Sequence, residues 1–109
     1  MGKTMIVKQG DTLRKHILFK YVGTDTPVDL TGVVGYSQLR AVPKGPLKAE
    51  GTVAIDASNG SIIVTYSASQ TSELEAGDYG FDVRLESEGD VKTVYTKYVK
   101  IIDPYTELE

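Results

Sequence analysis

At 109 residues the chain has the usual size of one domain, and without cysteine it can form neither a disulfide framework nor a thiolate metal site. Fifteen acidic residues outnumber twelve lysines and arginines, giving a net charge of −3. Nucleic-acid binding requires a concentrated basic surface, so nucleic acid is not an expected partner. Neither an apolar run of the ~20 residues that span a bilayer nor the apolar stretch of a signal peptide is present. We therefore expect a soluble domain, without membrane insertion or signal-peptide secretion.

The first third of the chain contains two predicted strands and a loop. Met5–Gln9 is followed by the Gly10-Asp11 turn signal. Thr12–Tyr21 then alternates, apart from Lys15 and Leu18, between an apolar face (Leu13, Ile17, Phe19, Tyr21) and a polar face (Arg14, His16, Lys20). Val22–Thr31 is rich in turn residues and is predicted to be a loop.

The remaining predicted strands are separated by clear turn signals. Gly32–Ala41 ends at Pro43-Lys44-Gly45-Pro46, because proline cannot donate to a strand ladder. Two hairpins follow, each with Gly beside a polar residue in its turn. Their strands and turns are Thr52–Asp56 and Ser61–Tyr66 around Ala57–Gly60, and Asp78–Glu86 and Val91–Ile102 around Ser87–Asp90.

One segment departs from the strand pattern. Ser67 and Gln70 have the spacing of a capping box, which predicts a short helix over Ala68–Leu74, ended by Gly77. Tyr79 follows at once, on the apolar face of the next strand. It suits a tyrosine corner, in which the ring is buried and the hydroxyl bonds to the backbone near Leu74–Gly77.

About seven strands and one short helix favour an all-β fold, an immunoglobulin or fibronectin III-like β-sandwich. An up-and-down barrel stays open as an alternative. Residues 1–107 are predicted to form a single domain, and the final Leu108-Glu109 pair is typical of a cloning-tag remnant.

The sequence predicts no catalytic, cofactor-binding or metal-binding residues. His16 is the one imidazole of the chain and lies among cations on a polar strand face, so we expect an ordinary surface histidine. Asp25, Asp29, Asp56 and Asn59 could contribute oxygen ligands to calcium. The same residue types also build turns, and turns are the preferred interpretation.

Tyr95, Lys97 and Tyr98, on the last predicted strand, are candidate contacts for a partner protein, although ordinary cross-strand pairing explains them too. Lysines along Val91–Ile102 are typical of a protected sheet edge (Lys92, Lys97, Lys100). Such an edge could also accept a strand from a partner.

Three pieces of the chain together carry a resemblance. They are Pro27-Val28-Asp29-Leu30-Thr31-Gly32, which leads into the Gln38-Leu39-Arg40 strand; Asn59-Gly60-Ser61-Ile62-Ile63-Val64, followed by Ser67–Thr71; and Leu74–Val83, whose hairpin returns through Lys92-Thr93-Val94. In this order they resemble the small immunoglobulin-like domains of tailed phages and prophages, including the N-terminal domain of baseplate upper proteins. The resemblance covers about Gly10 to Ile102.

The resemblance implies a non-enzymatic part of a tail, baseplate or fibre, made in the host bacterial cytoplasm and incorporated into the virion. Its partners would be other virion proteins. The resemblance also allows homo-oligomers of this chain within the assembly. Because fold is a poor guide to function, three alternatives remain. They are a carbohydrate- or cell-surface-binding module, a bacterial immunoglobulin-like module unrelated to phage, and an enzyme.

Overall fold

The computed structural model describes residues 5–41 and 45–103, and strands dominate it. The predicted all-β class is therefore confirmed. Pro43, Lys44 and the predicted tag remnant Leu108-Glu109 lie outside the described residues. The elements are β1 (Met5–Lys8), β2 (Leu13–Leu18), β3 (Val34–Ala41), β4 (Leu47–Asp56), β5 (Ser61–Tyr66), α1 (Ala68–Ser72), β6 (Gly77–Ser87) and β7 (Asp90–Ile102).

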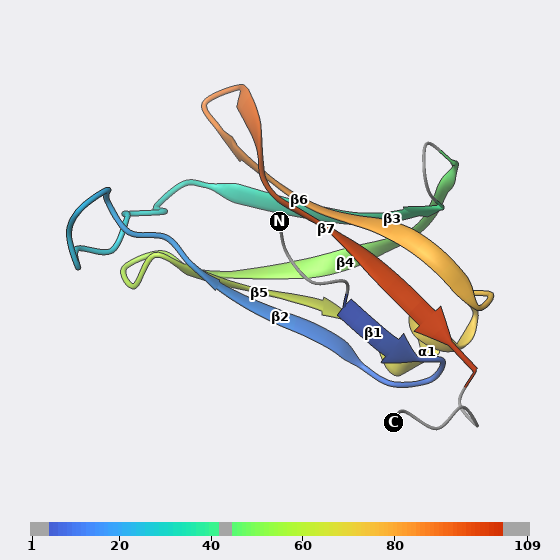
Figure 1. Ribbon diagram of the computed structural model, residues 1–109. Coiled ribbons are helices and arrows are strands. Elements are labelled where there is room, and N and C mark those ends of the chain that lie inside the picture. Colours follow the sequence, from blue (N-terminus) through green and yellow to red (C-terminus); the bar gives the residue numbers. More distant parts are fainter. Residues whose placement is uncertain (1–4, 42–44, 104–109) are drawn as a thin grey trace.

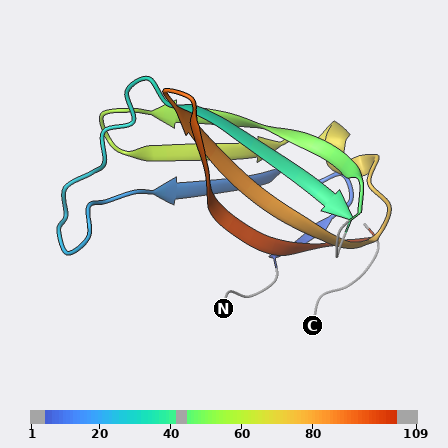
Figure 2. The ribbon, with the colours of Figure 1, turned by 90° about the horizontal axis from the view of Figure 1, so that it is seen from above.

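The strands form one continuous seven-stranded sheet in the order β1-β7-β6-β3-β4-β5-β2. This sheet folds back on itself, so that β3, β6 and β7 lie over β2 and β5 (Figures 1 and 2). All strand pairs are antiparallel except β1 with β7, which run parallel. Hydrogen bonding therefore joins the two layers into a single sheet.

The connection between the layers is β4. Its first half pairs with β3 and its second half, Thr52–Asp56, pairs with β5. The change of partner falls next to Gly51, where a Cβ atom would lie 2.7 Å from the Tyr66 ring. The predicted strand began only at Thr52 and was too short, because Lys48, Glu50 and Gly51 have little intrinsic strand preference. Pairing with β3 supplies what local preference lacks.

Aromatic rings fill the centre of the folded sheet. Phe81 makes edge-to-face contacts with Tyr66 at 6.0 Å and with Tyr95 at 5.8 Å between ring centroids. The rings are surrounded by aliphatic side chains from both layers. These side chains are Leu13, Leu39, Ile62, Val64, Val83, Val99 and Ile101. The core thus contains one inward-facing set of side chains from each layer, as the strand alternation predicts.

Both predicted hairpins are confirmed. Ala57–Gly60 connects β4 to β5, and Gly60 has a φ of +63°. Glu88 and Gly89 connect β6 to β7 with φ values of +52° and +87°. Two successive positive φ angles are those of a type I′ turn, whose twist matches that of the strands.

The second strand differs from its prediction at its end. β2 ends at Leu18, and Tyr21, expected on the apolar face, is exposed. Phe19 instead bonds through its backbone to Gly60 and Val28, which draws the chain into the loop. Lys15, which interrupted the sequence alternation, occupies an inward-facing position between Leu13 and Ile17.

The short helix begins as predicted. Ser67 accepts from the backbone of Gln70 while the Gln70 side chain accepts from the backbone of Ser67, which confirms the capping box. The helix ends at Ser72, earlier than predicted, with Glu73 as its C-cap. Gly77 is not its terminator, because it opens β6.

Tyr79 forms the predicted tyrosine corner. Its side chain is 5% exposed and its hydroxyl donates to the backbone oxygen of Glu75 at 2.7 Å. Burial raises the pKa of the phenol, so the hydroxyl remains a donor at neutral pH. The bond ties the segment after α1 to the start of β6.

Replacing Tyr79 by phenylalanine should lower the free energy of unfolding by about 0.5–1.5 kcal/mol, because one hydrogen bond is lost while the ring stays buried. Chemical denaturation measures this difference. Tyr98→Phe is the matched control, since Tyr98 is 63% exposed, and it should leave stability unchanged. Equal stability of the Tyr79 variant and the parent would show that the corner contributes nothing.

Replacing Gly51 by alanine should destabilise the domain by about 1–3 kcal/mol, because the added methyl group collides with the buried Tyr66 ring. Thermal or chemical unfolding tests this. Lys48→Ala, on an exposed position of the same strand, should change stability little. A Gly51 variant as stable as the Lys48 control would contradict the role assigned to the strand crossing.

Candidate functional site

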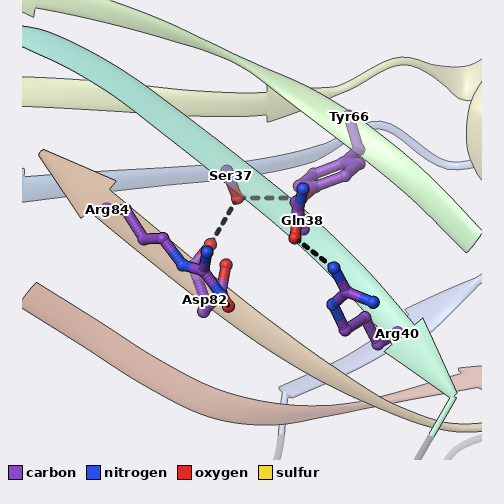
Figure 3. A network of polar contacts seen from close by, with 6 residues as sticks. All are labelled: Ser37, Gln38, Arg40, Tyr66, Asp82 and Arg84. Atoms are coloured by element: carbon purple, nitrogen blue, oxygen red, sulfur yellow. Dashed lines mark hydrogen bonds and ion pairs between the residues drawn. The ribbon is translucent and has the colours of Figure 1, made fainter. Parts of the chain in front are cut away.

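A polar network covers the middle of β3 and β6 on their outer face. Arg40 donates to the side-chain oxygen of Gln38 at 2.9 Å, and Arg84 lies 3.4 Å from a carboxylate oxygen of Asp82 (Figure 3). Gln38 pairs directly with Asp82 across the two strands. The Nε atom of Arg84 and the second carboxylate oxygen of Asp82 are enclosed without a hydrogen-bond partner. This network therefore retains unused hydrogen-bonding capacity.

The same place in the sheet is fixed from the inside by Tyr66. Its hydroxyl lies 2.8 Å from Oγ of Ser37, which in turn donates to the backbone oxygen of Asp82 at 2.7 Å (Figure 3). Since the one serine proton points at Asp82, Tyr66 must be the donor to Ser37. Burial raises the pKa of Tyr66 well above its usual range, which keeps that proton in place. The network thus rests on a rigid support that spans the core.

Exposed aromatic residues flank the network. Tyr36 on β3 is 47% exposed and donates to a carboxylate oxygen of Glu86 at 3.1 Å. Tyr98 on β7 lies opposite Gly80, which in turn lies opposite Arg40, so no side chain separates the tyrosine from the arginine across the sheet. Tyrosine and arginine are enriched at the centres of protein interfaces. The outer face of β3, β6 and β7 has this composition.

The three predicted partner-contact residues do not form one surface. Tyr98 belongs to the outer face, whereas Tyr95 and Lys97 alternate with it and share the inward side with buried Val99 and Ile101. The sequence prediction did not separate these two sides, because the alternation of the strand is disturbed. A register shift opposite Val83 and Arg84 leaves Val94 without a cross-strand partner. The strand therefore has a bulge at Val94.

Tyr95 and Lys97 lie on the part of β7 that faces β2, since Lys15 of β2 approaches the Tyr95 ring. Within residues 5–41 and 45–103, β1 pairs with β7 at Val99–Ile102, and the preceding part of β7 pairs with β6 alone. In the same residues β2 pairs with β5 alone. Of the predicted edge Val91–Ile102, the last four residues pair with β1, and Val91–Tyr98 has no second partner strand among the described residues. We call the region between β2 and Asp90–Tyr98, where Lys15 and Lys97 approach Tyr95, the seam.

Two lysines approach one aromatic ring at the seam. The Nζ atoms of Lys15 and Lys97 lie 5.7 and 5.8 Å from the centre of the Tyr95 ring. Within residues 5–41 and 45–103, neither lysine forms an ion pair with a carboxylate. The Tyr95 hydroxyl is enclosed and has no hydrogen-bond partner in this part of the chain. Lys15 was not among the predicted contact residues. Its position among the apolar side chains of Thr12–Tyr21 was the sequence signal that could have indicated a role for it.

A shallow depression of about 400 Å³ lies on the outer face of β2, β4 and β5. His16 and the exposed Leu18 and Ile63 line it, and Asn59 donates to Asp56 at its rim at 2.8 Å. His16 is exposed, as predicted. The depression presents mainly apolar surface.

The aspartates considered for calcium build turns. Asp29 accepts from the backbone and the hydroxyl of Thr31, at 3.0 and 2.6 Å, and these bonds lower the pKa of its carboxyl. Asp25 lies 4.0 Å from Lys20. Among the described residues, no cluster of three acidic, histidine or cysteine residues could hold a metal ion. No helix in this part of the chain is long and apolar enough to cross a membrane.

Comparison with known proteins yields a likeness of fold. No family model matches the chain, and no curated protein matches it either. Among solved structures it is similar to the N-terminal domain of phage TP901-1 ORF48, with a TM-score of 0.51 and 16% sequence identity. The likeness covers 91% of this chain and 84% of that one. The resemblance to a phage domain, which three short sequence pieces indicated, is thereby confirmed at the level of the fold.

The thermal midpoint should not depend on divalent ions, since the loop aspartates already bond to neighbouring groups and no ligand cluster is assembled among the described residues. Thermal unfolding in calcium, in magnesium and in chelator tests this. A rise of several degrees in calcium, abolished by Asp25→Asn or Asp29→Asn, would overturn the prediction and make the loop a metal site.

Proposed function

We propose that the chain is a non-enzymatic, immunoglobulin-like structural domain of a phage or prophage virion, in its tail, baseplate or fibre apparatus. It acts through contacts with other protein chains. The observation that carries this proposal is the likeness to a phage protein domain over 91% of the chain.

Three features support the immunoglobulin-like assignment. The last strand pairs with a parallel first strand, the two layers enclose one core, and a tyrosine corner lies at the start of the penultimate strand. This corner is a hallmark of immunoglobulin-like sandwiches. The single connection through β4 is the way in which this chain joins its two layers.

Two surfaces support action through protein contacts. The outer face of β3, β6 and β7 exposes tyrosine and arginine side chains on a rigid network. At the seam the described residues leave two strand edges without a second partner strand, and such edges can take up a strand from another protein. Many copies in one particle would turn weak single contacts into stable attachment.

The test is to induce particle production in the bacterium that encodes the chain and to purify the particles by density gradient. The chain should co-purify with tail-containing particles, as detected by mass spectrometry, and immunogold labelling should place it on the tail. An abundant host protein without a virion role serves as the contamination control. Absence of the chain from purified particles, although the cells express it, would refute the proposal.

A glycan array distinguishes the proposed function from the carbohydrate-binding alternative. The proposed function predicts no glycan signal above that of a denatured sample. Specific binding that is lost in Tyr98→Ala but kept in Tyr21→Ala, an exposed tyrosine outside this face, would favour a cell-surface-binding module instead.

A further inference from the structure

The charges of the chain are divided unevenly between the strands with free edges and the rest. Strands β1, β2 and β7 carry six lysines or arginines and a single acidic residue, Asp90. The whole chain has twelve basic and fifteen acidic residues. The two strand segments that form the seam carry four of these cations, Arg14, Lys15, Lys92 and Lys97, against the single carboxylate of Asp90.

The basic character continues into the seam itself. Lys15 on β2 and Lys97 on β7 are half-buried and converge on Tyr95 from two edges that have no second partner strand in the part of the chain that the structure describes. Inward-facing lysines on edge strands oppose indiscriminate pairing, because a neutral strand entering there would leave their charges without partners. A strand that brings carboxylates removes this penalty.

From this charge complementarity we infer that the seam is the docking site for an acidic, extended segment of a partner protein. The segment adds its backbone to a free edge of β2 or β7, and an inward-facing carboxylate lies between Lys15 and Lys97. A carboxyl or amide group there could also pair with the enclosed Tyr95 hydroxyl. This inference rests on the proposed action through protein contacts and specifies the chemistry of the partner.

A peptide is favoured over nucleic acid by the position of the cations. The two lysines lie on the inner side of the strands, beside unpaired backbone edges, whereas phosphate recognition draws on a concentrated and accessible basic surface. Unpaired strand edges match the backbone of an extended polypeptide.

The experiment titrates the domain with a capped peptide of about eight residues that alternates glutamate and valine, a length that matches one strand. A peptide alternating lysine and valine and a single-stranded oligothymidylate serve as comparison ligands. Backbone amide NMR signals of Leu13–Leu18 and Asp90–Tyr98 should shift with the acidic peptide and not with the basic one. Binding should weaken as salt increases.

Charge reversal at both lysines, Lys15→Glu with Lys97→Glu, should weaken binding of the acidic peptide by about tenfold. Lys48→Glu is the matched control, because it makes the same charge change at an exposed position of β4, and it should retain the parent affinity. If the reversed variant does not fold, Lys15→Met with Lys97→Met keeps the aliphatic stems and should show the same loss.

Several results would overturn the inference. Equal binding of the acidic and basic peptides, shifts confined to residues away from the seam, or no binding at all would each do so. Tighter binding of oligothymidylate at the same residues would indicate nucleic acid as the ligand. Concentration-dependent self-association abolished by the lysine variants would identify a second copy as the occupant.

The outcome is independent of the test in the previous section. If the chain is present in purified particles but the peptide does not bind, only the inference that the seam docks an acidic segment is refuted. Peptide binding at the seam by a chain that is absent from particles would refute the virion role and leave a peptide-binding domain.

Discussion

Strand β4 has to serve both layers of this fold, and the residues at its centre make this possible. The strand exchanges β3 for β5 as its partner beside Gly51, where the Tyr66 ring leaves no room for a side chain. The Tyr66 hydroxyl then reaches Ser37 on β3, which bonds to β6. The strand crossing, the aromatic core and the outer polar network therefore depend on one another.

The same arrangement explains why the surface has two distinct kinds of candidate contact. Support from the core holds the outer face of β3 and β6 rigid, which favours recognition by preorganised side chains. On the other side, β2 and the Asp90–Tyr98 part of β7 do not pair with each other among the described residues, and Lys15 and Lys97 converge on Tyr95. A contact there would rely on backbone pairing and charge.

Local patterns in the sequence were sufficient for much of the fold. The capping box at Ser67, the tyrosine corner at Tyr79 and both hairpins follow from neighbours within a few residues, and all are confirmed. The first half of β4 was missed because its strand character comes from pairing with β3, which no local pattern encodes. The bulge at Val94 likewise depends on the partner strand, so the sides of Tyr95 and Tyr98 could not be assigned.

The parallel pairing of β1 with β7 has a mechanical consequence. Met5 at the start of β1 lies opposite Val99, and Lys8 lies opposite Ile102 near the other end of the chain. When parallel strands are pulled apart from the first residue of one and the last residue of the other, they slide along each other. The force is then shared by all the bonds between them, whereas peeling would break them one at a time. Tension applied through the two ends of this domain therefore loads the hydrogen bonds between β1 and β7 in shear. Loaded in this way, the strand pair resists stretching better than it would if it were peeled apart.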